Sequence, residues 1–489
     1  MDEIWRLFVL IALSLIPHLA SAKTYNFNDF YQIMISSNAT YRTVAATARG
    51  AKITNDAMIS RYIPTLSLSR GSTTTTIQDQ ASIFATDVTN STLNTLSLTG
   101  GYPQAGMTYS TTLYSDAIVD TSLKGTEVSK SHSGNYSFSL TFNLLKGLGP
   151  LVGDIDFKQA DITETVATLN VKKTLLTSLK SLFTSYLGTF TAFINYKSSE
   201  DQLSKSIATL KNDLLKFKLG KIPKLNILTQ RTQRESLKAT VLSQKKSIMT
   251  SKILLLDQAG GKERKITHSD ITALDSISLN IFDMNKINEW RKAELSFNTL
   301  KNLDWKINRL NLRSSKLSYK QTKNNTLPSL DLTLGKGGNS LSQPGSTSFM
   351  QDDYSTNKSI TLSLSMPIGM ISERAAKKKA QLDLSANVLN FHQFKQELIR
   401  EWEKLKFDYE IAIQDLNVKQ AILDVATERY QSSLSTASLG STYQQNVVDY
   451  QTQLLSAIQN LNSSKNNLFL SKLDFYIFHG DTTFLKNIR

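Results

Sequence analysis

The sequence predicts an α+β protein in which strands with one apolar face alternate with unusually long helices. Three observations lead to this prediction. Two segments keep a helical apolar period far beyond the ~11–12 residues of an average helix. Shorter segments alternate apolar and polar residues, as strands with one wet face do. Both patterns occur twice in the same order, so the chain is interpreted as an internal two-fold repeat.

The long helices are indicated by apolar residues at steps of three, four and seven, which are coiled-coil steps. A helix from Gly153 to about Lys218 would be ~100 Å long at 1.5 Å per residue. That length is typical of a rod and not of a domain core. The first stripe is Ile162, Val166, Leu169, Leu176, Leu179, Phe183, Leu187, Phe190, Ile194, Leu203, Ile207, Leu210, Leu214 and Phe217, and the second is Leu384, Val388, Phe391, Leu398, Trp402, Leu405, Tyr409, Ile413 and Leu416.

Each long helix is predicted to end at a glycine turn, Leu219-Gly220 in the first copy and Leu439-Gly440 in the second. Glycine is favoured just past a last helical turn, and Pro223 suits the start of a returning helix. The two copies align at a constant offset of 220 residues, at which Gly220 corresponds to Gly440. The same offset also aligns identical residues in the pairs Asn226/Asn446, Thr232/Thr452, Gln233/Gln453, Ser236/Ser456, Ser243/Ser463, Lys245/Lys465, Ser251/Ser471, Lys252/Lys472 and Gly260/Gly480.

The strands are predicted as one hairpin in each copy. Ile63–Leu68 and Leu327–Leu332 each follow a helical stretch and begin with a proline at their second residue, near the strand start where proline is tolerated. Their partners are residues 136–144 and 360–366, where apolar residues alternate with Ser, Thr and Asn. Residues 71–135, inside the first hairpin, show further alternation, which fits either two additional strands or an extension of that hairpin.

The N-terminus has the pattern of a secretory signal peptide. An apolar run from Leu7 to Leu19 is followed by Ala20-Ser21-Ala22, so cleavage is expected after Ala22. A short buried helix is the alternative, and an uncleaved anchor is disfavoured because the run is shorter than the ~20 residues that span a bilayer. The predicted organisation is therefore: signal peptide, 1–22; first repeat, 23–260, with strands in 62–145 and a helical hairpin at 152–257; connecting segment, 261–285; second repeat, 286–480, with strands in 326–368 and a helical hairpin at 373–478; C-terminal tail, 481–489.

Composition excludes several classes of protein. The chain has no cysteine, which rules out disulfides and thiolate metal sites. Its net charge of +15 would suit nucleic acid or anionic lipid, but the basic residues are interleaved with Ser, Thr and Asn along the helices, which favours a solvated wall over nucleic-acid binding. The five histidines are far apart, and neither an HExxH nor a P-loop motif occurs, so we expect no enzyme, no cofactor and no metal site.

Two hairpins supply four strands, too few to close a membrane barrel, for which about eight are needed. An open sheet with one apolar face would carry unpaired edges, which lipid does not tolerate. Copies must therefore join edge to edge. The sequence predicts a barrel shared between protomers and continued by a tube of their amphipathic helices.

The order of three segments resembles the TolC family of outer-membrane efflux proteins: Phe27-Asn28-Asp29-Phe30, Leu144-Leu145-Lys146-Gly147-Leu148-Gly149, and Leu-Gly-x5-Asn-Val-Val-Asp at 439–449. The resemblance implies a homotrimer with a 12-strand barrel in outer-membrane lipid, a coiled-coil tunnel in the periplasm, and contacts with a periplasmic adaptor and an inner-membrane transporter. Because residues 71–135 exceed the insertion of the simplest members, four or more strands per protomer, and so a larger barrel, are the alternative. The expected function is the passive exit duct of a tripartite efflux or type I secretion system. The alternative is a secreted coiled-coil adhesin or scaffold without a pore.

The resemblance also places the tunnel entrance at Asn446 and Asp449, with Asn226 and Thr229 as the first-repeat equivalents. A ring of Asp449 side chains would attract cations. Alternatively, the asparagines cap the returning helices and Asp449 complements a helix N-terminus. Adaptor contact is expected at the two helical turns, and the tyrosine and arginine that latch some members are replaced by Ala437 and Thr442. The expected contact residues are Leu219, Gly220, Leu439, Gly440 and Thr442.

Overall fold

The computed structural model describes residues 25–487, with gaps at 79–85, 123–128, 149, 261–265, 268, 273, 275–280, 298–300, 343–354, 367 and 437–441. The predicted signal peptide lies outside the described residues. The chain divides into two compact units, each of which draws on both repeats. The helical unit comprises Met1–Thr47, Thr168–Ile307 and Phe394–Arg489, and the sheet unit comprises Ala48–Ala167 and Asn308–Gln393.

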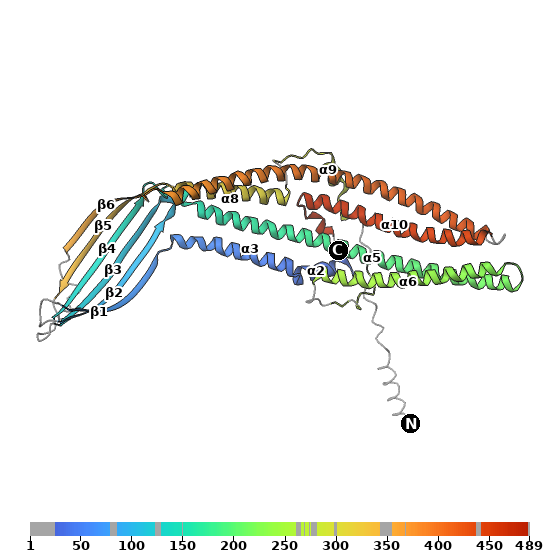
Figure 1. The fold of residues 1–489 in the computed structure, drawn as a ribbon, viewed down its shortest axis with the longest axis horizontal. Helices are drawn as coiled ribbons and strands as arrows, with labels where there is room; N and C mark the ends of the chain where they lie inside the picture. Colours follow the sequence, from blue (N-terminus) through green and yellow to red (C-terminus); the bar gives the residue numbers. More distant parts are fainter. Residues whose placement is uncertain are drawn as a thin grey trace, which may run out of the picture. The chain divides into compact units, whose positions relative to one another are not determined.

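The sheet unit contains six antiparallel strands that lie side by side in chain order (Figure 1). Residues 71–135 therefore add two strands, which is the first of the two alternatives that the sequence left open. The predicted pairing of the first strand with residues 136–144 is wrong, because β2 and β3 lie between them. The strands are β1 (Thr65–Gln78), β2 (Thr86–Tyr102), β3 (Met107–Ser122), β4 (Ser129–Asn143), β5 (Ser329–Ser342) and β6 (Ser355–Ser365).

The register of the sheet gathers apolar side chains on one face. Tyr109 pairs with Leu140, Leu140 with Leu334, and Leu334 with Ile360, so one row of four strands is apolar throughout. Residues directly opposite each other in a ladder share a face, and alternate residues face the other way. The opposite face carries hydroxyl groups, for example in the pairs Thr65–Thr99, Ser110–Ser139 and Thr141–Thr333.

Helices of the sheet unit are linked side by side by polar side chains. Asn55 of α3 donates to Glu164 of α5 at 2.6 Å, Gln159 of α5 to Ser318 of α8 at 2.9 Å, and Asn387 of α9 to Ser315 of α8 at 3.0 Å. Helix α3 has no buried residue, as expected of one layer of helices with two free faces (Figure 1). The bounds are α3 (Ala39–Ala57), η1 (Met58–Tyr62), α4 (Pro150–Gly153), α5 (Ile155–Lys218), α8 (Leu303–Asn325) and α9 (Ile371–Thr436).

The helical unit has an aromatic core where α2 crosses α5. Phe27 stacks on Phe183 with ring centroids 3.9 Å apart, and Tyr186 donates its hydroxyl to the Tyr25 carbonyl at 3.2 Å. Helix α2 begins with a capping box between Asn26 and Asp29, and the neighbouring residues Phe27 and Phe30 are buried in the core. The segment Phe27-Asn28-Asp29-Phe30 therefore contributes to both the cap and the core. The remaining elements of the described chain are α2 (Phe27–Ser37), η2 (Pro103–Ala105), α6 (Lys224–Ala259), α7 (Met284–Lys292), α10 (Thr442–Phe478) and η6 (Thr483–Asn487).

Candidate functional site

The first helical turn is built as the sequence predicts. Gly220 has φ +74°, its N–H donates to the Phe217 carbonyl, and the N–H of Lys221 donates to the Lys216 carbonyl, both at 2.9 Å. These two bonds form a Schellman motif, which requires a left-handed residue that glycine adopts without steric cost. Leu219, beside it, is 70% exposed. This turn therefore presents an apolar side chain to its surroundings.

The second turn is described only in part. Leu439, Gly440 and Ala437 lie outside the described residues. Thr442 and Asn446 are described as residues of α10, without their side chains. The contact and latch predictions for this turn therefore stay predictions.

Thr229 of α6 and Asp449 of α10 line one groove of about 750 Å³. Across it, Gln233 lies 3.4 Å from the Thr452 hydroxyl, so the returning helices of the two repeats are neighbours. Asp449 is exposed, and Thr229 is half-buried with its hydroxyl donating to the Leu225 carbonyl. The structure thus brings together two of the four residues that we expected at the entrance.

Asn226 does not line this groove. Its side chain is buried, and its Nδ2 has no hydrogen-bond partner among the described residues. The N-cap of α6 is Pro223, so the alternative in which Asn226 caps this helix is wrong. Asp449 is the eighth residue of α10, beyond the first turn in which a helix dipole acts strongly. The entrance proposal therefore depends on Asp449 and Thr229.

Buried polar side chains pack between the helices on the far side of this groove. Gln451 of α10 donates its side-chain amide to both the backbone carbonyl of Gln202 at 3.0 Å and its Oε1 at 2.8 Å. Ser206, one turn further along α5, is also buried, and its hydroxyl has no partner in the described part of the chain. A core of this kind depends on directed hydrogen bonds, each worth roughly 0.5–1.5 kcal/mol net.

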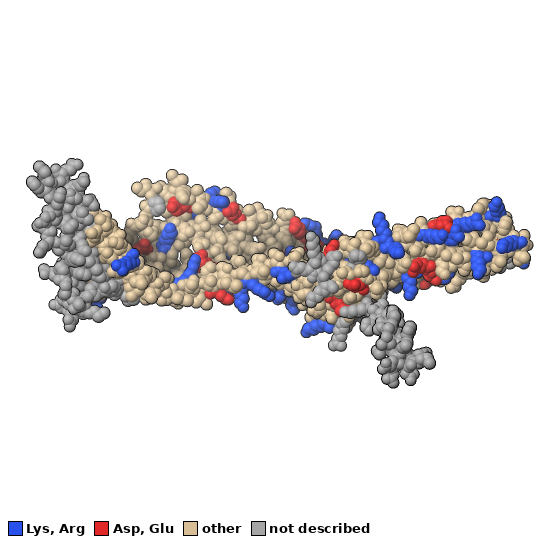
Figure 2. Space-filling view, turned by 90° about the horizontal axis from the view of Figure 1, so that it is seen from below, with Lys and Arg blue, Asp and Glu red and all other residues tan. Residues whose placement is uncertain are grey.

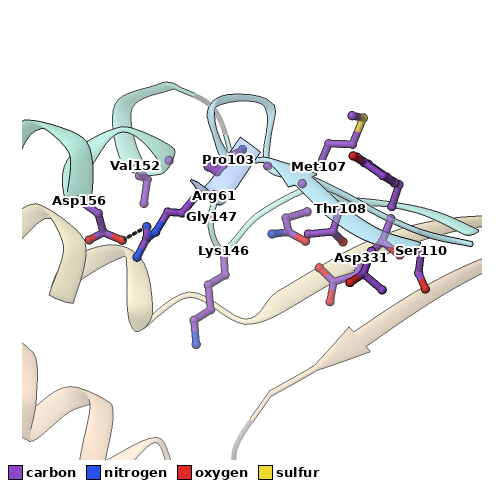
Figure 3. A pocket seen from close by; sticks show the side chains of 18 of the residues that line it. Arg61, Pro103, Met107, Thr108, Ser110, Lys146, Gly147, Val152, Asp156 and Asp331 are labelled. Carbon is purple, nitrogen blue, oxygen red and sulfur yellow. Dashed lines mark hydrogen bonds and ion pairs between the residues drawn. The ribbon is translucent and has the colours of Figure 1, made fainter. Parts of the chain in front are cut away.

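The sheet unit contains a polar cavity of about 1010 Å³ at the helix-proximal end of its strands (Figure 3). Hydroxyl-bearing residues of the wet sheet face line it, together with Lys146 and Asp331. At its helical side, Arg61 pairs with Asp156 at 2.5 Å, as the dashed line in Figure 3 marks, and Asp156 also accepts from Gln321 at 2.9 Å. Sequence reasoning missed this cavity because its residues come from segments far apart in the chain.

Charge is spread along the described surface. On the face shown in Figure 2, Lys and Arg occur along the molecule with Asp and Glu among them. Inside the helical unit, burial raises the pKa of Asp474, although Lys180 lies 2.5 Å away and opposes the shift. Burial also lowers the pKa of Lys252 and of its repeat equivalent Lys472.

Across the described residues, no helix is long and apolar enough to span a membrane. No group of three or more His, Asp or Glu side chains in the described ranges could hold a metal ion.

Residues 300–472 match the family model of outer membrane efflux proteins. This segment resembles the outer membrane efflux proteins. The match confirms the resemblance predicted from the sequence and covers much of the second repeat, including α8, the strands β5 and β6, α9 and most of α10. The family is one of efflux proteins and not of enzymes. A comparison with curated proteins gave no match.

The fold of this chain is similar to that of solved outer-membrane channels. OprN matches at a TM-score of 0.64 and 15% identity, over 93% of this chain and 89% of that one. CusC matches at a TM-score of 0.65 and 13% identity, over 93% of this chain and 92% of that one. VceC from Vibrio cholerae matches at a TM-score of 0.64 and 12% identity, over 93% of this chain and 95% of that one. The predicted fold class, strands of a membrane channel combined with very long helices, is confirmed.

Proposed function

We propose that this chain is one protomer of a trimeric exit duct in the outer membrane, which passively conducts substrates delivered by a periplasmic adaptor and an inner-membrane pump. The observation that carries the proposal is the sheet. One of its faces is apolar and exposed, with Leu68 and Ile360 each 79% exposed. The opposite face is lined by hydroxyls. An apolar exterior and a polar interior are the pattern of a barrel wall in lipid.

The two edges of the sheet supply the reason for assembly. Among the described strands, β1 pairs only with β2 and β6 only with β5. With an even number of strands in chain order, β6 of one copy and β1 of the next would run antiparallel. Pairing of copies would close the barrel and remove both edges, which lipid would otherwise leave unsatisfied.

The strand count changes the expected barrel. Three copies of a six-stranded sheet supply eighteen strands, and not the twelve that the resemblance implied. Barrel diameter grows roughly linearly with strand number, and barrels of ~16–18 strands leave an aqueous channel. We therefore propose a wider exit than that of a twelve-stranded duct.

Helix α9 supports contacts between copies in the helical unit. Five of its apolar side chains are exposed in the single chain and recur at steps of four, seven, four and three, which are coiled-coil steps. The exposed residues are Phe407, Ile411, Val418, Ile422 and Val425. Burying such a stripe against a second copy would gain about 25 cal/mol per Å² of apolar area.

The entrance is proposed at the helical turns, where three copies would bring Asp449 and Thr229 into a ring. Carboxylates at a narrow mouth concentrate cations and repel anions. Exposed Leu219 and the turn around Gly220, with their counterparts Leu439, Gly440 and Thr442, are the proposed adaptor contacts.

Conductance tests the proposal. The purified oligomer should conduct in planar bilayers with a preference for cations, and Asp449→Asn should weaken that preference. Glu428→Gln is the matched control, because it removes an exposed carboxylate of the same unit away from the groove. Cell fractionation distinguishes the duct from the alternative, a secreted adhesin or scaffold. A soluble elongated monomer would indicate the adhesin or scaffold, whereas a detergent-solubilised oligomer from outer membranes supports the duct.

A further inference from the structure

The helical unit contains a second cavity, of about 540 Å³, that neither the turns nor the helix stripes explain. Helix α7, the segment after it, the middle of α9 and the residues just after α10 supply its lining. Three of the lining side chains are aromatic: Trp290, Trp402 and His479. The volume lies within the ~300–1,000 Å³ typical of small-ligand pockets.

The three rings form one continuous wall. Trp290 stacks on His479 with centroids 4.2 Å apart and planes at 9°, and Trp402 meets His479 edge to face at 5.3 Å. Tyr476 packs against Trp290 with ring centroids 5.0 Å apart, and its hydroxyl accepts a hydrogen bond from the backbone N–H of Asp283 at 2.9 Å. Because each ring is held by a neighbour, the wall is largely formed before any ligand arrives.

Two ring nitrogens of this wall are candidates for binding a ligand. Trp402 is 2% exposed, and its indole N–H has no acceptor among the described residues, although buried indole N–H groups usually find one. His479 Nδ1 lies 2.9 Å from the Phe475 carbonyl, so Nδ1 carries the proton and Nε2 is an acceptor. Burial lowers the pKa of His479, which keeps the ring neutral. The wall therefore holds one unpaired donor, the Trp402 indole N–H, and one acceptor, His479 Nε2.

The rim of the pocket is polar and electrically balanced. Lys286 donates to Asp481 at 3.3 Å and to the Thr483 hydroxyl at 3.0 Å, so its charge is neutralised. The remaining charged lining residues are Glu294 and Lys301, which are of opposite sign. Such a rim gives no net attraction to an ion, and its hydroxyl, ammonium and carboxylate groups suit a neutral ligand rich in hydroxyls.

We propose that this pocket binds a neutral saccharide that carries an amide group, such as an N-acetylated sugar. The half-buried Trp290 ring can pack against the C–H bonds of a sugar ring. The amide carbonyl can accept from the Trp402 indole after a small adjustment of the wall, and the amide N–H can donate to His479 Nε2. Hydroxyl groups, each both donor and acceptor, fit the mixed rim.

The saccharide has two possible sources. If the helices cross the periplasm, which rests on the proposed function, a glycan strand of the cell wall is one source and a soluble saccharide is the other. Co-sedimentation of the oligomer with insoluble murein sacculi identifies the first. Binding of a soluble disaccharide without co-sedimentation identifies the second.

The test uses the full-length oligomer, purified in a detergent without a sugar headgroup and titrated with N,N′-diacetylchitobiose. The chain has four tryptophans, and those outside the predicted signal peptide are Trp290, Trp305 and Trp402, so intrinsic fluorescence reports on the pocket directly. We expect a saturable fluorescence change, at least tenfold weaker apparent affinity for maltose, which lacks the amide, and no saturable change with N-acetyl-diglycine amide.

Three variants assign the binding to this pocket, with affinity measured by calorimetry. His479→Ala keeps all three tryptophans and should weaken binding at least tenfold. Trp402→Phe keeps a ring but removes the indole N–H, and should also weaken it. Trp305→Phe removes a buried indole that does not line the pocket, and should bind as the parent does. Oligomer integrity is checked by its mass in detergent.

Three results would overturn the inference. The disaccharide gives no saturable fluorescence change, N-acetyl-diglycine amide binds as tightly as the disaccharide, or His479→Ala in an intact oligomer binds the disaccharide as the parent does. The binding measurement needs no ion conduction. An oligomer that conducts but does not bind overturns this inference alone, and one that binds but does not conduct overturns only the duct.

Discussion

Asn38 and Asn302 make the same two hydrogen bonds in the two repeats. Asn38 accepts from the Tyr41 N–H at 3.0 Å and donates to the Gln258 carbonyl at 3.0 Å. Asn302 accepts from the Trp305 N–H at 2.9 Å and donates to the Phe478 carbonyl at 2.8 Å. Each asparagine thus caps one helix and fastens it to the end of a returning helix. The internal duplication is therefore visible in three dimensions as well as in the sequence.

The Asn302 bridge should be important for stability. Asn302→Ala removes a cap and leaves a buried N–H and a carbonyl unpaired, which costs about 1–3 kcal/mol for each such group. Thermal unfolding followed by circular dichroism should show a clearly lower midpoint. Asn285→Ala, at an exposed residue of α7, is the control and should change the midpoint little. An equal effect of both variants would contradict the bridging role.

Two glycines allow a matched test of the first helical turn. A Cβ added at Gly220 or at Gly188 would meet nothing within 4 Å, but only Gly220 has a positive φ. Gly220→Ala should therefore destabilise by roughly 1–2 kcal/mol, the cost of a left-handed L-residue. Gly188→Ala, inside α5, should stabilise by about 0.5–1 kcal/mol. Unfolding midpoints that shift in the same direction would refute the Schellman interpretation.

The bond between Gln451 and Gln202 should control local opening near the turns. Gln451→Ala leaves buried polar groups of Gln202 without their donor, so hydrogen exchange in this part of α5 and α10 should accelerate by about tenfold, which corresponds to 1.4 kcal/mol. Gln453→Ala, two residues away and exposed, should leave exchange unchanged. Identical exchange in both variants would mean that this polar core does not hold the helices.

Asp474 predicts a dependence of stability on pH. Because burial raises its pKa, the folded state binds this proton more tightly than the unfolded state does, so the contribution is present below the unfolded pKa of ~3.9 and is lost as pH rises through the folded value. Asp474→Asn removes the titration. The midpoint difference, variant minus parent, should be more positive at pH 7 than at pH 4.

The control for this titration is Asp201→Asn, which breaks the exposed 2.6 Å ion pair with Lys205. Exposed pairs contribute about 0–1 kcal/mol, so the difference from the parent should stay small at both pH values. A pH-independent difference for Asp474→Asn would show that its carboxyl is not destabilised by burial.

Local chemistry made much of the fold predictable. The apolar period predicted a helix ending near Lys218, and α5 ends there because Gly220 terminates it. Strand pairing was not predictable in the same way. Residues 63–68 and 136–144 both alternate cleanly, but alternation specifies a face and not a neighbour, so β2 and β3 could not be placed between them. Only the register of the folded sheet decides this.

The candidate sites were predictable in part. Asp449 was found from the family resemblance, and Thr229 from the repeat offset, which places equivalent residues at equivalent heights along the returning helices. The burial of Asn226 was not foreseen, because the offset specifies height and not which side of a helix faces a neighbour. Trp290, Trp402 and His479 belong to three separate segments, and no spacing in the sequence links them.

Ion conduction by the purified oligomer in planar bilayers is the decisive measurement for the proposed duct. We expect discrete current steps that favour cations, with the preference reduced by Asp449→Asn and unchanged by Glu428→Gln. Oligomers of correct mass that give no current at any pH or ionic condition would contradict it.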